Sequence, residues 1–266
     1  MNIKLLFADT SMKKILMIKL YGTIVESDDS MINHKFSAFK LLNKLYDVYE
    51  QKDYDGILIR INSPGGAASA SEEIAEAILM LKNINIPVVV SIGDICASGA
   101  YLIASAANQI FANRMSLVGS IGAIMQIPNF TDLAEKIGVS LITASSGKMK
   151  DIGNPARTMT EEEKAYLDNL VSIAASNFQE TVLMNRNIIN AEKMTDGRIV
   201  DAKEALENKL IDKIGTYNDA LNYFKRLFNV DVLNVEEFKE KKSALKKILN
   251  LASLNLTSID SYLKFM

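Results

Sequence analysis

Three short segments of the chain place serine or aspartate beside glycine, and each follows a run of residues typical of a β-strand. They are Ser63-Pro64-Gly65-Gly66 and the segments 94–100 and 118–122. Adjacent glycines leave backbone N–H groups uncovered by side chains, as a pocket that binds an oxyanion requires. Ser98 stands at a predicted strand-to-helix turn, which exposes a hydroxyl at a helix N-terminus, where negative charge is favoured. These residue types in this order predict nucleophilic catalysis by a serine.

A serine nucleophile needs a base that takes its proton. The chain has one histidine, His34, which precedes all three segments on a predicted amphipathic helix, so a Ser-His-Asp triad is not expected. The remaining candidate is a lysine, which acts as a base only where burial lowers its pKa. Lys148 and Lys150 both lie in the turn-rich segment 145–155, and the residue types alone leave both open.

Alternating strand and helix signals surround these segments. Apolar and β-branched runs predict strands at residues 14–20, 56–61, 87–92, 109–111, 121–127 and 139–143, the third of them ending at Gly93. Apolar spacing and end signals predict helices at residues 34–50, 71–82 and 161–187, and another that begins near Ser98. Thr160 and Glu163 form the pattern of a capping box at the start of the 161–187 helix. The alternation indicates an α/β fold with mainly parallel pairing, which brings the three segments to one edge of a sheet.

Composition argues against several classes of protein. The 266 residues are 48% hydrophobic and carry a formal net charge of −2, which is typical of a globular protein and argues against nucleic acid as a partner. Cys96 is the only cysteine, so we expect no internal disulfide and expect the side chain to pack as a small hydrophobe. No uncharged apolar stretch reaches about 20 residues, so no spanning helix is expected. No cluster of ligand residues points to a metal.

Five stretches together resemble one family. They are residues 60–66, 97–105, 119–122, 146–155 and 196–200, and the resemblance extends over about residues 14–225. They are similar to bacterial signal peptide peptidase A in its short, half-length form, a serine–lysine protease of the Clp-protease/crotonase-like superfamily. The resemblance implies a repeated β-β-α superhelix with a mainly parallel sheet in residues 1–228, and a reaction that needs no cofactor.

The resemblance also implies roles for individual residues. Ser98 matches the nucleophile, and Lys150 matches the general base because Lys150, not Lys148, directly precedes an Asp-x-Gly-x-Pro run. Ser120 matches the serine that orients the base lysine. The oxyanion pocket matches backbone N–H groups at Gly65, Gly66 and Gly99.

Two residues depart from the family pattern. Met149 stands where an aromatic residue usually precedes the base, and Ala100 stands where a second glycine usually follows the nucleophile. The Cβ of Ala100 is expected to narrow the pocket. Both reacting groups are retained.

The resemblance implies peptide substrates, such as remnant signal peptides or other membrane-derived peptides with small or apolar side chains at the cleavage position. Apolar residues near the turns, namely Ala67, Ala68, Ile121 and Ile124, are consistent with this substrate class. The family's long form carries its lysine and its serine on different halves of a duplicated chain, whereas this chain carries one copy of each motif. The resemblance therefore implies a ring-like homo-oligomer that completes each serine–lysine pair across a subunit interface. The family is usually anchored in a membrane, whereas this chain is expected to be cytoplasmic or peripherally membrane-associated.

Residues 229–266 differ from the rest of the chain. Five lysines between residues 239 and 247 precede a leucine-rich stretch at residues 248–256. This pattern predicts a C-terminal helical tail that docks on the body or on a neighbouring subunit, and the alternative is a peripheral membrane helix.

Other functions are also compatible with the sequence. A crotonase-like acyl-CoA hydratase or isomerase would share the fold, with Asp94 or Asp132 as its base. An inactive scaffold would keep the fold and the assembly without the chemistry. A cysteine peptidase that uses Cys96 is disfavoured because the sequence offers it no histidine partner.

Overall fold

The computed structural model describes residues 12–26 and 35–239. Contacts within the chain divide it into Met1–Glu236 and Glu237–Met266, and the site described below lies in the first unit. His34 and residues 240–266 of the predicted tail lie outside the described residues. Within the described ranges, no helix combines the length and the apolar character needed to cross a bilayer.

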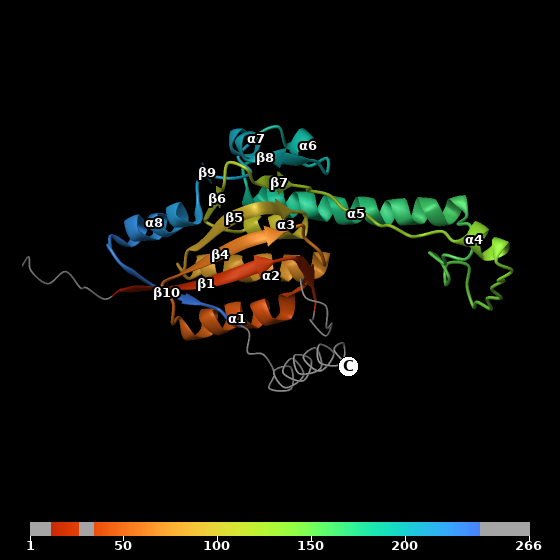
Figure 1. Ribbon diagram of the computed structural model, residues 1–266, viewed down its shortest axis with the longest axis horizontal. Coiled ribbons are helices and arrows are strands. Elements are labelled where there is room, and N and C mark those ends of the chain that lie inside the picture. The colour runs from red at the N-terminus through yellow and green to blue at the C-terminus, as the bar shows by residue number, and fades with distance from the viewer. Residues whose placement is uncertain (1–11, 27–34, 240–266) are drawn as a thin grey trace, which may run out of the picture. The chain divides into compact units, whose positions relative to one another are not determined.

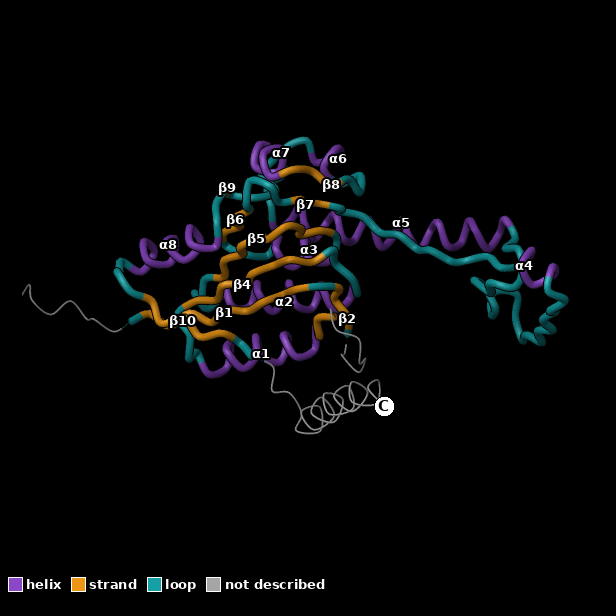
Figure 2. Tube along the Cα trace, viewed as in Figure 1, coloured by secondary structure: helices purple, strands orange, loops and turns teal. Residues whose placement is uncertain are grey.

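A mostly parallel sheet forms the centre of the first unit (Figures 1 and 2). Its strand order is β10-β1-β4-β5-β6-β9, with β7 paired to β5 and β8 paired to β7. The β7–β8 pair is antiparallel, whereas β1–β4, β4–β5, β5–β6, β5–β7 and β6–β9 are parallel. The strands are β1 (Lys13–Tyr21), β4 (Gly56–Ser63), β5 (Val88–Ala97), β6 (Gln109–Ala112), β7 (Leu117–Gly119), β8 (Ile199–Asp201), β9 (Lys213–Ile214) and β10 (Leu233–Glu237). This confirms the predicted α/β class with mainly parallel pairing.

Helices cover the sheet because the apolar side chains on both of its faces need to be buried. Helix α8 (Tyr217–Phe228) packs Phe224 against Ile15, Leu58 and Phe111 of three different strands. Helices α1 (Ala38–Gln51), α2 (Ala68–Asn83) and α3 (Gly99–Ser105) pack on one another in succession. Short elements α6 (Ala191–Met194) and α7 (Ala202–Glu207) flank β8.

Strand β5 is longer than the sequence predicted, and its extra length positions the nucleophile candidate. The prediction ended the strand at Gly93, but it continues to Ala97. The register between β4 and β5 shifts here, and the Asn62 side chain bridges the irregularity, with its oxygen accepting from the Asp94 and Ile95 N–H groups at 3.1 Å. This side chain replaces lost ladder bonds, so the strand reaches Ser98 without a break.

Other predicted elements were wrong in position or type. The first helix begins at Ala38 rather than at residue 34, and Lys35–Ser37 forms strand β3, which pairs in parallel with β2 (Thr23–Val25). Residues 121–127 and 139–143 are loops, not strands. A strand needs a neighbour for its backbone hydrogen bonds, and within the described residues neither segment has one.

Helices α4 (Thr131–Lys136) and α5 (Glu161–Asn185) extend from the sheet (Figure 1). The predicted capping box is confirmed, because the Thr160 side chain accepts from the Glu163 N–H while the Glu163 side chain accepts from the Thr160 N–H. Helix α4 buries no residue, and the 25 residues of α5 bury only Glu163 and Val182. Most of this region is therefore unpacked within a single chain.

The start of the predicted C-terminal tail is not helical. Helix α8 ends at Phe228, and Leu233–Glu237 forms β10, which lies beside β1 in the sheet. The domain boundary at residue 228 and the helical tail beyond the described residues stay predictions.

Candidate active site

Ser98 lies in a strained turn between β5 and α3. Its backbone has φ 53° and ψ −130°, a conformation that costs a non-glycine residue about 1–3 kcal/mol. The Ser98 N–H donates to the Gly119 carbonyl at 2.9 Å, and the Ser98 carbonyl accepts from Tyr101 and Leu102 in α3. The side chain is half-buried. Strand, turn and helix thus hold one serine in a conformation that serine does not adopt by preference.

The glycine pair after β4 packs directly against this turn. Gly65 has φ +99°, and a Cβ there would lie 2.7 Å from the Ala97 carbonyl oxygen and 2.8 Å from the Gly99 nitrogen. Strand β2 holds the pair from its other side, because Ile24 donates to the Gly65 carbonyl at 2.9 Å and accepts from Ala67 at 3.0 Å. Glycine is therefore required at Gly65 by both its φ and its contacts.

Two of the three expected oxyanion donors are available. The Gly65 N–H donates to Ser63 Oγ at 3.1 Å, so it is already engaged. In the described ranges of the chain, the N–H groups of Gly66 and Gly99 have no hydrogen-bond partner. A Cβ built on Gly99 would lie 3.5 Å from the Gly66 nitrogen, which places the two groups side by side next to Ser98.

Ser120 lies on the neighbouring strand end. Ala97 and Gly119 are register partners in β5 and β7, so Ser98 and Ser120 directly follow two paired strands. Ser120 also has a positive φ, 54°, and its N–H donates to the Arg198 carbonyl at 2.7 Å. The structure thus brings together Ser98, Ser120, Gly65, Gly66 and Gly99, as the sequence predicted.

A cavity of about 350 Å³ opens beside Gly66 and Gly99. Its apolar lining includes Ala68, Leu102, Ala123, Ile124, Ala174 and Phe178, and its polar lining includes Ser69, Glu72, Asn177 and Thr181. Ala68 and Ile124 were expected here. Ala67 is not among the lining residues, and Ile121 and Ala100 are fully buried, so Ala100 does not narrow this cavity.

The carboxylates that a crotonase-like reaction would use lie elsewhere. Asp94 is exposed and accepts from the Asn62 side chain at 3.0 Å, and Asp132 is exposed in the first turn of α4. Neither lines the cavity. Cys96 is fully buried, and burial raises the pKa of its thiol, so the predicted packing role is confirmed and a thiolate nucleophile is disfavoured.

Lys150 is not brought to Ser98 within the chain. The loop that carries it, residues 147–160, lies beyond α4 at the N-terminal end of α5, whereas Ser98 lies at the sheet (Figure 1). Lys148 and Lys150 are both exposed, and the Lys150 N–H donates to the Gly147 carbonyl at 3.1 Å. One chain therefore holds the nucleophile side of the predicted pair and presents the lysine separately.

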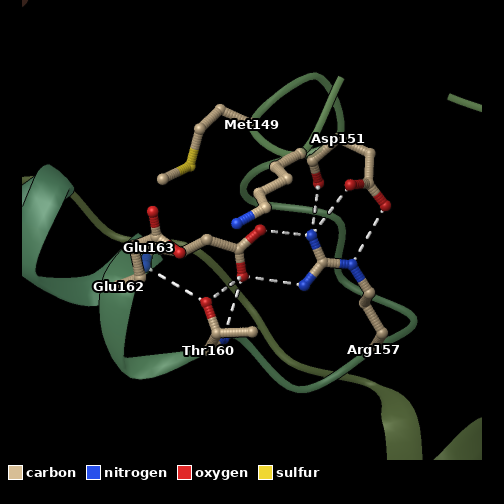
Figure 3. Close-up of a pocket in the computed structure, with 7 residues that line it drawn as sticks. Met149, Asp151, Arg157, Thr160, Glu162 and Glu163 are labelled. Atoms are coloured by element: carbon tan, nitrogen blue, oxygen red, sulfur yellow. Dashed lines mark hydrogen bonds and ion pairs between the residues drawn. The ribbon is translucent and has the colours of Figure 1, made fainter. Parts of the chain in front are cut away.

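A cluster of charged side chains that sequence reasoning missed organises the lysine loop (Figure 3). Arg157 donates to both Asp151 carboxylate oxygens, at 3.0 and 2.9 Å, and to both Glu163 oxygens, at 2.8 and 2.5 Å. These bonds hold the pKa of Asp151 below its ordinary value and lower the pKa of Glu163 to about 2, and they raise that of Arg157. The sequence identified Glu163 only as part of the capping box. Its spacing from Thr160 gave no sign that Glu163 also binds Arg157.

Comparisons with known proteins show the family of this chain. Peptidase family S49 matches residues 80–231, which span more than half of the chain and include Ser98, Ser120 and Lys150. The chain belongs to peptidase family S49. An S49 relative, a putative signal peptide peptidase SppA from Enterococcus faecium, is 35% identical over 233 residues, covering 86% of this chain and 68% of the relative. The chloroplastic serine protease SPPA of Arabidopsis thaliana is 30% identical over 94% of this chain and 38% of its own length.

A solved protease structure gives the architecture independent support. A membrane-bound stomatin-specific protease, solved with a substrate peptide, matches with a TM-score of 0.53 and 16% identity, covering 91% of this chain and 98% of that one. At that identity the likeness shows the fold alone. The predicted α/β fold, which the chain shares with this solved protease, and the resemblance to signal peptide peptidase A are confirmed, and the chain is a serine peptidase of family S49.

Proposed function

We propose that this S49 peptidase cleaves peptides with a Ser98–Lys150 dyad. Neutral Lys150 takes the proton of Ser98 Oγ while the oxygen bonds to the peptide carbonyl carbon. The N–H groups of Gly66 and Gly99 hold the resulting oxyanion, and Ser120 orients the lysine. Lys150 then gives its proton to the leaving nitrogen as the C–N bond breaks. The same lysine then takes a proton from water as the water oxygen bonds to the acyl carbon, and returns it to Ser98 Oγ as the Oγ–C bond breaks and the acid leaves.

The observation that carries this proposal is the strained turn at Ser98 beside two unpartnered N–H groups in the described structure. Backbone strain of this kind persists only where surrounding contacts impose it, and it gathers at reactive residues. The Gly119 carbonyl, which accepts from the Ser98 N–H, holds the turn on one side. Gly65, itself held by its bond to Ile24, packs against the turn on the other side. Gly65 shapes the loop, and Gly66 and Gly99 supply the donors.

We propose further that Lys150 acts on Ser98 of a neighbouring copy in a ring-like homo-oligomer. The chain's own lysine loop does not reach its own serine, so the site is incomplete without a second copy. The same region exposes large apolar side chains, among them Ile142, which is 96% exposed, and Phe130, Leu133, Ile137, Leu141 and Ile173. Exposed apolar surface on this scale marks a site of protein association. A neighbouring copy would cover it and would also withdraw Lys150 from water.

The proposed substrates are extended peptides with small or apolar side chains at the cleavage position, such as remnants of signal peptides. The size and the apolar part of the cavity beside Gly99 support this class, as does the similarity to a putative signal peptide peptidase SppA. A peripheral contact with a membrane, through the basic and leucine-rich residues 239–256, would place the peptidase near such peptides.

Hydrolysis of a panel of short fluorogenic peptides tests the dyad. Wild-type protein is expected to cleave peptides with small or apolar residues, and Ser98→Ala and Lys150→Ala are each expected to be inactive while assembling normally. Lys148→Ala is the matched control, because it removes an exposed lysine two residues away and is expected to stay active. Full activity of Lys150→Ala would overturn the proposal.

A further inference from the structure

We propose that Arg157 is a positioning residue for the general base: it fastens the lysine loop to the first turn of α5, so that helix and lysine move as one body. The inference rests on the proposed function, because it takes Lys150 as the base. Its observation is the convergence of Asp151 and Glu163 on one guanidinium (Figure 3).

The two carboxylates belong to different parts of this region, one to the lysine loop and the other to helix α5. Asp151 directly follows Lys150 in the loop, and both of its carboxylate oxygens and its carbonyl, the latter at 3.3 Å, accept from Arg157. Glu163 belongs to α5 and is 3% exposed, and it also accepts from the Thr160 N–H at 2.9 Å as part of the capping box. One guanidinium therefore joins the residue beside the base to the most buried residue at the start of the helix.

The lysine loop has few other means of fixing its shape. One other bond ties the loop to the start of α4, because the Phe130 N–H donates to the Pro155 carbonyl at 2.7 Å. The remaining bonds are short-range, such as Lys150 N–H to the Gly147 carbonyl and Asn154 N–H to the Asp151 carbonyl. Lys150 itself is exposed in this loop, whereas Asp151 beside it and Arg157 are half-buried. Losing the Arg157 bonds would therefore leave the direction of the Lys150 side chain set by the loop alone.

The proposal depends on the planar arrangement of the arginine N–H donors rather than on the charge of the side chain. A guanidinium offers five donors in a plane and can bind two carboxylates with paired bonds, whereas an ammonium has three donors on one nitrogen. Lys148, Asp151, Glu162 and Glu163 are the other charged residues that line the hollow around this cluster. Arg157→Lys keeps the charge balance of that hollow and removes the paired geometry.

The test compares Arg157→Lys with Arg186→Lys in the assembled protein. Arg186 caps the opposite end of α5 and pairs with both oxygens of Asp212, at 2.8 and 3.2 Å, so it has like geometry but no contact with the lysine loop. Initial rates against peptide concentration and pH are measured for both variants, beside wild type and Lys150→Ala. Assembly and thermal midpoint are recorded for each.

Arg157→Lys is expected to lower kcat by about 10²-fold with little change in KM, since misplacement of a catalytic group by about 1 Å has that cost. The acid limb of its pH profile should move to higher pH, because a lysine that is no longer held away from water loses its proton only at higher pH. Arg186→Lys should keep the wild-type pH profile. Asp151→Asn, a milder change to the same cluster, should move the profile in the same direction as Arg157→Lys.

A purely structural role for Arg157 would give another result. The thermal midpoint would fall, and kcat per assembled site and the pH profile would match wild type, and this would overturn the positioning role while leaving the dyad intact. An active Lys150→Ala would instead overturn the proposed function itself. The two failures are thus distinguished within one set of measurements.

Discussion

The turn that holds Ser98 and the loop that holds Lys150 are built in opposite ways. Ser98 follows a central strand, and backbone contacts from Gly65 and Gly119 fix its conformation from neighbouring strands. In the described part of the chain the lysine loop has no strand beside it, and its lysines are exposed. The Arg157 cluster and a bond from Phe130 to the Pro155 carbonyl hold its shape. The difference teaches that contacts within one chain fix the turn at Ser98, whereas they leave Lys150 exposed on a loop away from the sheet.

Gly66→Ala is the change expected to have the largest effect on the nucleophile side. A Cβ there would collide with the Ile24 carbonyl oxygen and lie 2.7 Å from the Ile24 nitrogen, at a φ of +156°. The donor next to Ser98 would be displaced, and kcat is expected to fall about 10²–10³-fold in peptide hydrolysis.

The matched change on the base side is Gly147→Ala. A Cβ at Gly147 meets open space in the single chain. The free energy of unfolding of the chain should stay within about 0.5 kcal/mol of wild type by urea denaturation. A loss of stability as large as that of Gly66→Ala would contradict the contrast between the two regions.

Charging the outer face of α5 should separate the copies without unfolding the chain. Leu170 and Ile173 lie one turn apart and are 37% and 50% exposed. In the variant Leu170→Glu/Ile173→Glu, light scattering should show smaller assemblies, and peptidase activity should fall at least tenfold. The thermal midpoint of the separated chain should match that of wild-type chains diluted to the same state. An intact, active assembly would show that this face is not an interface.

Acid should weaken the cluster of the base side in a defined pH range. Glu163 has its pKa lowered from 4.5 to about 2, so its ionised form stabilises the fold above pH 4.5, and this contribution is lost as the pH falls through about 2. The difference in unfolding free energy between wild type and Glu163→Gln should therefore shrink from pH 4.5 downward. Urea denaturation across that range measures it, and a constant difference would contradict the assigned pKa.

The smallest expected effect concerns a neighbouring ion pair. Lys164 and Glu161 pair across one turn of α5 at 2.6 Å, and both side chains are exposed. Such pairs contribute about 0.3–0.5 kcal/mol, so Lys164→Ala should change neither stability nor rate appreciably. A rate loss comparable to that of Arg157→Lys would show that any charge change at the start of α5 disturbs the base.

The sequence predicted the nucleophile side well because its signals are local. Strand periodicity, the glycine pair and a serine between strand and helix all lie within a few residues of each other, and parallel pairing brings strand ends together. It missed the extension of β5 to Ala97, since that depends on the Asn62 side chain from another strand. It also counted Gly65 as a donor, because the competing Ser63 Oγ is visible only in three dimensions.

The base side was predicted less well for a related reason. Apolar runs at residues 121–127 and 139–143 suggested strands, but within the described chain they have no neighbour and lie in loops. Whether an apolar run forms a strand depends on its burial and on a pairing partner, and the sequence alone does not show which runs have them. The Arg157 cluster joins residues six apart on either side, a spacing that is typical of no regular element.

Mixing inactive variants tests the central claim most directly. Chains with Ser98→Ala and chains with Lys150→Ala would be denatured together, reassembled in equal amounts and assayed with a cleavable peptide. If each site takes its serine and its lysine from different copies, random assembly restores about a quarter of the wild-type rate. If the mixed assemblies form normally and stay inactive, the serine and the lysine of a site do not come from different copies, which contradicts the proposed shared site.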